Sequence, residues 1–220
     1  MLGSILDFLN QAAFHIAGSP TTIAEILGFV TGGLSVFLVA RNNILTFPVG
    51  ILNAAFFFVL FIDAKLYADA WLQVFFLAIQ IVGWVSWLKA GPNRTELRVS
   101  RAAPVVLLPA LTLTALLAYL LVPVLRDAHG AYPVADSSTT ALSVAAQTLM
   151  CLRVVQHWYL WIAADLIYIP LYAAKGLYFT SALYVIFLAL CITGLRNWRR
   201  ILRDDDPAPV VRPVMEEVTP

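Results

Sequence analysis

A stretch of this chain, Ile51 to Trp87, recurs without a gap 111 positions later as Ile162 to Trp198. An apolar chain gives some identities by chance, so the rarer matches carry the weight. They are Gly83 with Gly194, Trp87 with Trp198, Leu66-Tyr67 with Leu177-Tyr178, and the acidic pair Glu25 with Asp136. A duplicated unit with so long a period predicts a membrane transporter with two pseudo-equivalent halves.

The composition also indicates a membrane protein. Hydrophobic residues make up 61% of the chain and charged residues 12%, whereas soluble proteins have about 25% charged residues. Seven apolar runs lie between short charged clusters, at 23–40, 44–62, 68–88, 104–124, 138–154, 157–174 and 179–196. Most are close to the roughly 17 to 25 residues that span a bilayer as a helix, and their lack of alternation excludes a membrane β-barrel. We expect an all-α integral membrane protein with seven transmembrane helices.

The two ends of the chain are predicted to lie outside this bundle. Residues 1–20 have apolar side chains at helical spacing, interrupted by Asp7, Asn10 and Gln11. This pattern favours an N-terminal interfacial helix, with an eighth partial span as the alternative. Residues 201–220 are acidic and rich in proline, without apolar periodicity, which predicts a disordered cytoplasmic tail.

The repeat also predicts how the helices are grouped. Two three-helix units can enter the membrane from the same side only if an odd number of helices separates them. The first repeat is expected over 21–89 and the second over 138–200, with a linker transmembrane helix over 104–124 between them. A cytoplasmic loop at 90–103 and an external loop at 125–137 complete the chain. This 3+1+3 arrangement of parallel repeats is that of the SWEET sugar carriers.

Basic residues set the predicted orientation. Eleven of the fourteen Lys and Arg residues lie on the side of the loop at 90–103, and only Lys65, Arg126 and Lys175 lie on the other. The positive-inside rule therefore places the N-terminus outside and the C-terminus in the cytoplasm. Because topology explains these cations and the net charge is only +1, no nucleic-acid partner is expected; the lipid bilayer is.

The residue types required for catalysis do not cluster in the sequence. There is no glycine-rich phosphate loop, and His15, His129 and His157 lack metal-ligand spacing. Cys151 and Cys191 lie inside predicted helices and are interpreted as small buried side chains rather than a disulfide. We therefore expect no cofactor, no metal and no enzymatic activity.

One face of the predicted helix at 157–174 gathers aromatic side chains around an acid. At 100° per residue, the members of this face fall within about 80° of arc: Trp158, Trp161, Asp165, Tyr168 and Tyr172. A carboxylate inside a span costs about 2.5 to 3.5 kcal/mol on insertion scales, so Asp165 should face a cavity or a partner. A protonated Asp165 that hydrogen-bonds to a neighbouring helix is the alternative.

Other predicted helices contribute to the same site. The additional candidate binding residues are Asn53, Gln73, Gln80, Gln147 and Tyr184. The repeat maps Gln73 onto Tyr184. These two residues therefore lie on the same face of two equivalent helices. We expect an aromatic cage with amides and one acid between the two triple-helix units, near the membrane midplane.

Each group in this cage has a structural alternative. Amides in membranes often hydrogen-bond neighbouring helices instead of ligands. Tyr172 lies near the outer end, where it fits an interfacial belt as well as a pocket. Trp87 and Trp198 are predicted to be belt residues, whereas Trp158 and Trp161 are predicted to line the pocket because they share the stripe of Asp165.

Several motifs resemble those of the Pnu-type vitamin transporters. They are Phe47-Pro-Val-Gly-Ile-Leu-Asn53, Leu66-Tyr67-Ala68-Asp69, Leu72-Gln73-Val74-Phe75-Phe76, Gly83-Trp84, His157-Trp158-Tyr159-Leu160-Trp161 and Lys175-Gly176-Leu177-Tyr178, in the expected order over about 23 to 200. The resemblance implies facilitated diffusion (uniport) of a vitamin precursor, typically nicotinamide riboside, which a cytoplasmic vitamin kinase traps by phosphorylation. It also implies a homo-oligomer, such as a trimer, of SWEET-like protomers.

The resemblance further implies which residues line the site. The matching positions are Asn53, Gln73, Trp158, Trp161, Asp165 and Tyr184. Some nicotinamide riboside carriers have Asn where this chain has Asp165, so thiamine and riboflavin stay open as substrates. Aromatic faces attract a cation by roughly 0.5 to 2 kcal/mol each, which ranks uncharged riboflavin last. A membrane receptor that binds the ligand without moving it is the alternative from another class.

Overall fold

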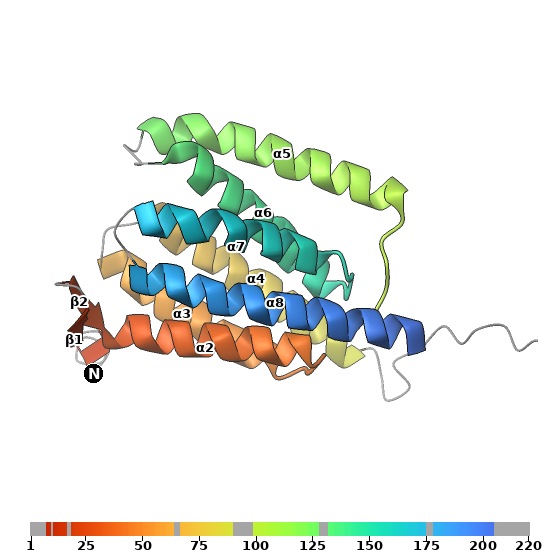
Figure 1. The fold of residues 1–220 in the computed structure, drawn as a ribbon, viewed down its shortest axis with the longest axis horizontal. Coiled ribbons are helices and arrows are strands. Elements are labelled where there is room, and N and C mark those ends of the chain that lie inside the picture. Colours follow the sequence, from red (N-terminus) through yellow and green to blue (C-terminus); the bar gives the residue numbers. More distant parts are fainter. Residues whose placement is uncertain are drawn as a thin grey trace, which may run out of the picture.

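The computed structural model describes residues 8–9, 11–16, 19–63, 67–89, 99–127, 132–174 and 178–204. Long helices dominate this part of the chain (Figure 1): α2 (Ile23–Ala40), α3 (Thr46–Asp63), α4 (Tyr67–Lys89), α5 (Pro104–Asp127), α6 (Pro133–Cys151), α7 (His157–Ala174) and α8 (Tyr178–Asp204). Two short antiparallel strands, β1 (Ala12–Ile16) and β2 (Ser19–Thr22), precede them. All seven helices follow the predicted apolar runs.

The N-terminal segment differs from the prediction of a helix over 1–20. Its described residues form mainly the β1–β2 pair, and α2 begins only at Ile23. The physical reason is local: Phe14, Thr21 and Thr22 favour extended backbone, and Pro20 lacks the N–H that a helix interior requires. Residues 1–7 lie outside the described part of the chain.

Two helices extend further than predicted. α6 begins at Pro133, inside the predicted external loop at 125–137, because proline is favoured in the first turn of a helix and Asp136 adds a negative charge there. α8 continues to Asp204, four residues into the predicted tail, where Arg200 and Asp204 form an ion pair of 3.6 Å. The prediction of disorder over 205–220 lies outside the described residues.

The helices form two groups of three that contact each other at two places. α2, α3 and α4 pack in succession, and so do α6, α7 and α8. α2 packs against α8, and α4 packs against α6. α5 runs along one edge of the bundle and packs against α6 (Figure 1). In the repeat, α2 corresponds to α6 and α4 corresponds to α8. Exchange of the two groups therefore converts the contact between α2 and α8 into the contact between α6 and α4.

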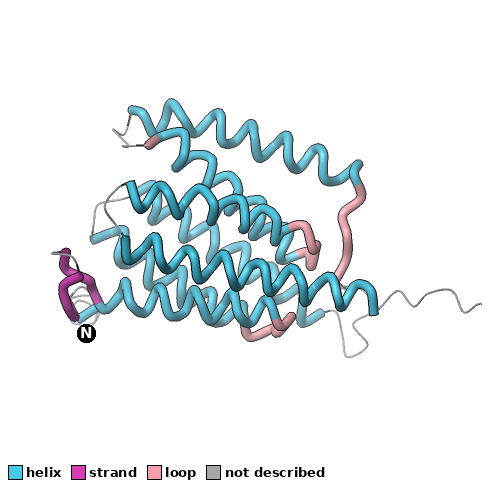
Figure 2. The backbone as a smooth tube through the Cα atoms, viewed as in Figure 1, coloured by secondary structure: helices cyan, strands magenta, loops and turns pink. Residues whose placement is uncertain are grey.

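The turns that follow α2 and α6 have the same backbone structure, and both lie at one end of the bundle (Figure 2). Asn42 and Arg153, 111 positions apart, have left-handed backbones with φ of 52° and 54°. Equivalent hydrogen bonds close both helices: Asn42 N to Val39 O at 2.8 Å and Asn43 N to Leu38 O at 2.9 Å, then Arg153 N to Met150 O at 2.9 Å and Val154 N to Leu149 O at 3.0 Å. This pattern is the Schellman motif.

Two buried tryptophans tie the groups together. Trp87 on α4 donates its indole N–H to the Cys151 carbonyl at the end of α6, at 3.1 Å. Trp198 on α8 donates to the Val39 carbonyl at the end of α2, at 2.8 Å. The two side chains are only 4% and 0% exposed, so their predicted place in an interfacial belt is wrong. The last carbonyls of a helix lack partners within it, and each indole supplies one.

Much of the apolar surface faces outward. By length and composition, three described segments could cross a membrane: Ala70–Lys89, Pro104–Asp127 and Ser181–Asp204. Ile26–Ala40 and Thr46–Leu60 are shorter apolar helical segments. α5 contains no buried residue, although it is rich in leucine and valine. Such an apolar exterior suits a hydrocarbon environment.

Candidate ligand-binding site

Asp165 lies in the middle of α7 and is 4% exposed. Its carboxylate accepts a hydrogen bond from the thiol of Cys191 on α8. Its second oxygen, Oδ2, has no hydrogen-bond partner within the described residues. The predicted alternative, a bond to a neighbouring helix, is therefore realised for one oxygen only. An unpaired buried carboxylate oxygen is costly, so this atom is suited to a donor or a cation from outside the chain.

Three tyrosines form an aromatic wall on the same side of α7 and α8. Tyr184 contacts both of the others, with ring centroids 4.6 Å from Tyr168 and 5.2 Å from Tyr172. Tyr168 and Tyr172 are stacked at 5.6 Å, and Phe187 meets Tyr184 edge-on at 5.6 Å. Residues three and seven positions after Asp165 share its helix face, so the wall continues the surface that carries the acid. Tyr168, Tyr172 and Tyr184 come together as predicted from the sequence.

Asn53 joins α3 to α2. Its Nδ2 donates to the Gly28 carbonyl at 2.5 Å and lies 3.3 Å from the Thr31 hydroxyl. This is the interhelical use of an amide that the sequence left as an alternative. A Cβ on Gly32 would lie 3.2 Å from Asn53 Nδ2 and 3.8 Å from the Phe187 ring. The absence of a side chain at Gly32 thus places Asn53 beside the end of the aromatic wall.

The three candidate glutamines lie on α4 and α6, whereas the tyrosine wall lies on α7 and α8. Gln80 on α4 is buried against Gly50 of α3, where a Cβ would come within 3.0 Å of its amide. Gln147 on α6 is buried, and its Nε2 has no hydrogen-bond partner in the described part of the chain. Gln73 is half-buried on α4. The contact of Gln80 therefore joins α4 to α3, and Gln147 belongs to the buried side of α6.

The two predicted pocket tryptophans differ in their environment. Trp158 is 1% exposed and packs between His157 at 4.4 Å and Trp198 at 5.9 Å, over Gly194. It belongs to the buried core in this conformation and not to an open wall. Trp161 is half-buried and packs against two clusters of buried side chains, one that contains Trp158 and one that contains Leu160. Only Trp161 of this pair retains exposed surface near the level of Asp165.

Sequence reasoning did not assign several contacts that shape this site. Cys191 shares the stripe of Tyr184, yet nothing in the sequence identified it as the partner of Asp165. Phe187 approaches α2 at Gly32 and Gly33, and a run of small residues is a signal that could have been recognised. The guanidinium carbon of Arg153 lies 3.8 Å from the ring centre of Trp87.

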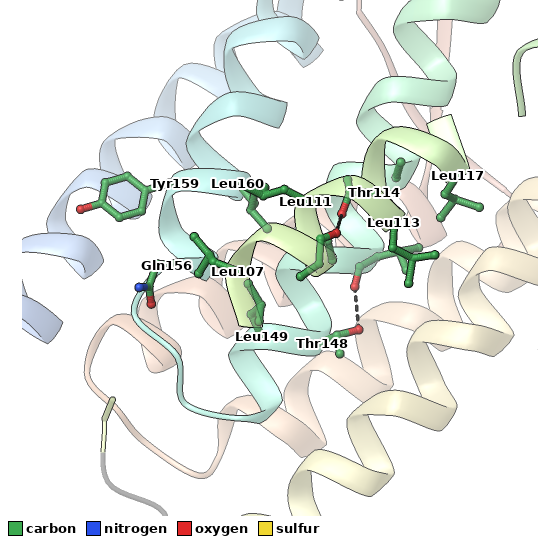
Figure 3. A pocket seen from close by; sticks show the side chains of 14 residues that line it. Leu107, Leu111, Leu113, Thr114, Leu117, Thr148, Leu149, Gln156, Tyr159 and Leu160 are labelled. Carbon is green, nitrogen blue, oxygen red and sulfur yellow. Dashed lines mark hydrogen bonds between the residues drawn. The ribbon is translucent and has the colours of Figure 1, made fainter. Parts of the chain in front are cut away.

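A separate groove of about 300 Å³ lies between α5, α6 and α7 (Figure 3). Leucines and alanines form most of its walls, with Gln156 and Tyr159 at one end. Its two threonines, Thr114 and Thr148, donate their hydroxyl hydrogens to carbonyls of their own helices at 2.8 Å. The groove does not include Asp165 or the tyrosine wall, and the sequence did not predict it.

Comparison with known proteins adds a family to this geometry. Residues 22–200 match the family described as nicotinamide mononucleotide transporters. The nicotinamide riboside transporter PnuC of Escherichia coli is 27% identical over 227 residues, which cover 91% of this chain and 95% of that protein. The riboflavin/roseoflavin transporter RibM of Streptomyces davaonensis is 26% identical over 215 residues, which cover 96% of this chain and 98% of that protein. A crystal structure of the vitamin B3 transporter PnuC is similar in fold, with a TM-score of 0.67, 24% identity and coverage of 83% of each chain.

Proposed function

We propose that this chain, which belongs to the nicotinamide mononucleotide transporter family, carries nicotinamide riboside across the bacterial cell membrane by facilitated diffusion. The family and the apolar helices indicate a multi-pass membrane transporter rather than an enzyme. The observation that carries the substrate proposal is the buried Oδ2 of Asp165, without a hydrogen-bond partner in the described residues, beside three packed tyrosines.

The charge of the ligand follows from these groups. Nicotinamide riboside has a pyridinium ring, which is flat, aromatic and positively charged. Tyrosine faces attract such a ring, and the carboxylate of Asp165 complements its charge. The Nε2 of Gln147, which has no hydrogen-bond partner in the described residues, and the amide of Gln73 are suited to hydrogen-bond the carboxamide and ribose groups. Thiamine, also a cationic aromatic molecule, meets the same requirements.

A second candidate substrate is riboflavin, because RibM is almost as similar to this chain as the Escherichia coli transporter is. Its isoalloxazine ring is uncharged, so it would stack on the tyrosines without using the Asp165 charge. We therefore rank it below the cationic vitamins.

The proposed architecture is 3+1+3, with parallel repeats at 21–89 and 138–200 joined by α5. Its support is the equivalence of the two turns and the exchange symmetry of the contacts between the helix groups. The N-terminus lies outside and the C-terminus in the cytoplasm, by the distribution of basic residues. Alternating access then arises from movement of one triple-helix unit against the other around the site.

Passive uniport is favoured because Asp165 is the one acidic residue placed well inside a predicted span. Net accumulation then requires a cytoplasmic kinase that phosphorylates the vitamin and so prevents its return. The protomers are proposed to assemble into a homo-oligomer. The alternative from another class, a receptor, would bind the ligand without moving it.

The test is uptake of radiolabelled nicotinamide riboside into liposomes that contain the purified protein, with and without a proton or sodium gradient. A carrier should equilibrate the label at a rate that the gradients do not change, and excess thiamine and riboflavin should be compared as competitors. Binding without equilibration would indicate a receptor. Stronger competition by riboflavin than by thiamine would reject the cationic-ligand assignment.

A further inference from the structure

The groove beside α5 has walls that suit hydrocarbon. α5 packs against α6, and residues of both helices and of the start of α7 line the groove. Leu107, Leu111 and Leu160 are among the side chains that line it (Figure 3). The hydroxyl hydrogens of its threonines are directed to their own helices, so the interior offers no free hydroxyl donor. Its volume of about 300 Å³ is that of a small ligand pocket.

One end of the groove is polar, but the side-chain amide of Gln156 at this end already makes hydrogen bonds within the protein. The side chain of Gln156 accepts from Ala102 N at 3.0 Å and donates to Ala102 O at 3.1 Å. It holds the segment before α5 against the turn before α7. The polar group that stays accessible at this end is Tyr159, which is exposed and marks the margin of the groove (Figure 3).

Tyr159 in turn positions a cation. Arg199 of α8 donates a hydrogen bond from its guanidinium to the Tyr159 hydroxyl, and its charged carbon lies 5.5 Å from the ring centre. Both partners of this contact are exposed. The neighbouring Arg200 and Arg203 contact the carboxylate of Asp204 instead. Among the described residues no acidic side chain pairs with Arg199, which lies beside Tyr159 at the margin of the groove.

We propose that this groove is a binding site for an anionic phospholipid. One acyl chain occupies the space between α5, α6 and α7, and the phosphate contacts Arg199 beside Tyr159. Basic positions between membrane helices are a recurring way to bind anionic lipid head groups, and guanidinium pairs well with phosphate oxygens. The charge at the rim favours lipid over a second copy of this chain, which would have to bury an unpaired arginine. The proposal rests on membrane insertion alone and is independent of the transported substrate.

The experiment uses the full chain purified in a mild detergent, with added phosphatidylglycerol or phosphatidylcholine of the same acyl chains. Native mass spectrometry measures lipid retained per protomer, and thermal unfolding measures stabilisation by each lipid. The unmodified protein should retain more phosphatidylglycerol. Loss of one arginine contact of about 1 kcal/mol should reduce this preference roughly fivefold in Arg199→Gln. Arg203→Gln, whose cation pairs with Asp204, is the matched control and should keep the preference.

A second variant tests the acyl groove itself. Ala110→Phe on α5 fills part of the cavity and should reduce retention of both lipids, with uptake of the vitamin into liposomes still measurable. Equal retention of the two lipids by the unmodified protein would overturn the proposal, and so would an unchanged preference in Arg199→Gln. If Ala110→Phe changes the oligomer mass but not lipid retention, the groove is an interface between copies and the lipid proposal is rejected.

Discussion

Trp198 donates its indole N–H to the carbonyl oxygen of Val39, 2.8 Å away, across the boundary between the two helix groups. Trp87 of the first group donates its indole N–H to the carbonyl of Cys151 in the second group. Each tryptophan therefore satisfies a terminal carbonyl of the other group. The same end of the bundle holds both left-handed turns, so the two groups are joined there by reciprocal contacts. These contacts predict where stability is concentrated.

Trp198→Phe should destabilise the protein by about 1 to 3 kcal/mol, because it removes a buried hydrogen bond to the Val39 carbonyl and leaves space where the larger indole packed. Thermal or denaturant unfolding in detergent measures the effect. Trp71→Phe is the matched control, because Trp71 is 73% exposed and its replacement should change stability by less than about 0.5 kcal/mol. Equal effects of the two substitutions would contradict the role given to Trp198.

Gly194→Ala should also destabilise, by about 1 to 3 kcal/mol, because the new methyl group overpacks a full core. Its Cβ would come within 3.0 Å of the Trp158 ring, which has no room to move. Gly33→Ala provides the comparison, since its Cβ would meet Phe187 at an ordinary 3.5 Å. We expect Gly33→Ala to be neutral or mildly stabilising in the same unfolding assay. A tolerated Gly194→Ala would show that Trp158 is not fixed in the core.

Asp165→Asn should weaken binding of nicotinamide riboside roughly tenfold, because it removes a charge-assisted contact. Binding of an uncharged analogue of the same shape should change much less. Calorimetric titration of both ligands measures the difference. Cys191→Ser, which keeps a donor to the carboxylate, serves as the control and should preserve the preference for the cation. Equal losses for the charged and the uncharged ligand would reject the charge role.

Tyr184→Ala should reduce affinity roughly 2- to 30-fold, from the 0.5 to 2 kcal/mol expected of a cation–π contact. Tyr184→Ala removes the ring that contacts both Tyr168 and Tyr172. Tyr184→Phe keeps this ring and should retain most of the affinity. The same titration measures both variants. If Tyr184→Phe loses as much affinity as Tyr184→Ala, the hydroxyl and not the aromatic face is what matters.

The sequence was sufficient for the helices and for the grouping of the tyrosines. α2 and α7 have the predicted bounds of 23–40 and 157–174, because an apolar run ended by polar residues leaves little freedom in a membrane helix. Tyr168 and Tyr184 meet because each lies on the face that its helical phase predicts.

Contacts between distant helices could not be predicted in the same way. Because Trp198 lies near the end of an apolar run, its sequence position resembles that of an interfacial-belt residue. Only tertiary packing shows that its indole N–H reaches α2. Asp165 was expected to face a cavity or a partner, but its pairing with Cys191 depends on how α7 rotates against α8. At the N-terminus, local β propensity and Pro20 outweighed an apolar pattern that also fits a helix.

Counterflow in liposomes tests the central claim most directly. Vesicles that contain the protein and a high internal concentration of unlabelled nicotinamide riboside are diluted into labelled ligand, with no ion gradient. A passive carrier with a charge-selective site should draw in the label transiently, and Asp165→Asn should reduce this uptake more than uptake of an uncharged analogue. Label that never exceeds its level in protein-free vesicles, although calorimetry detects binding, would contradict the account.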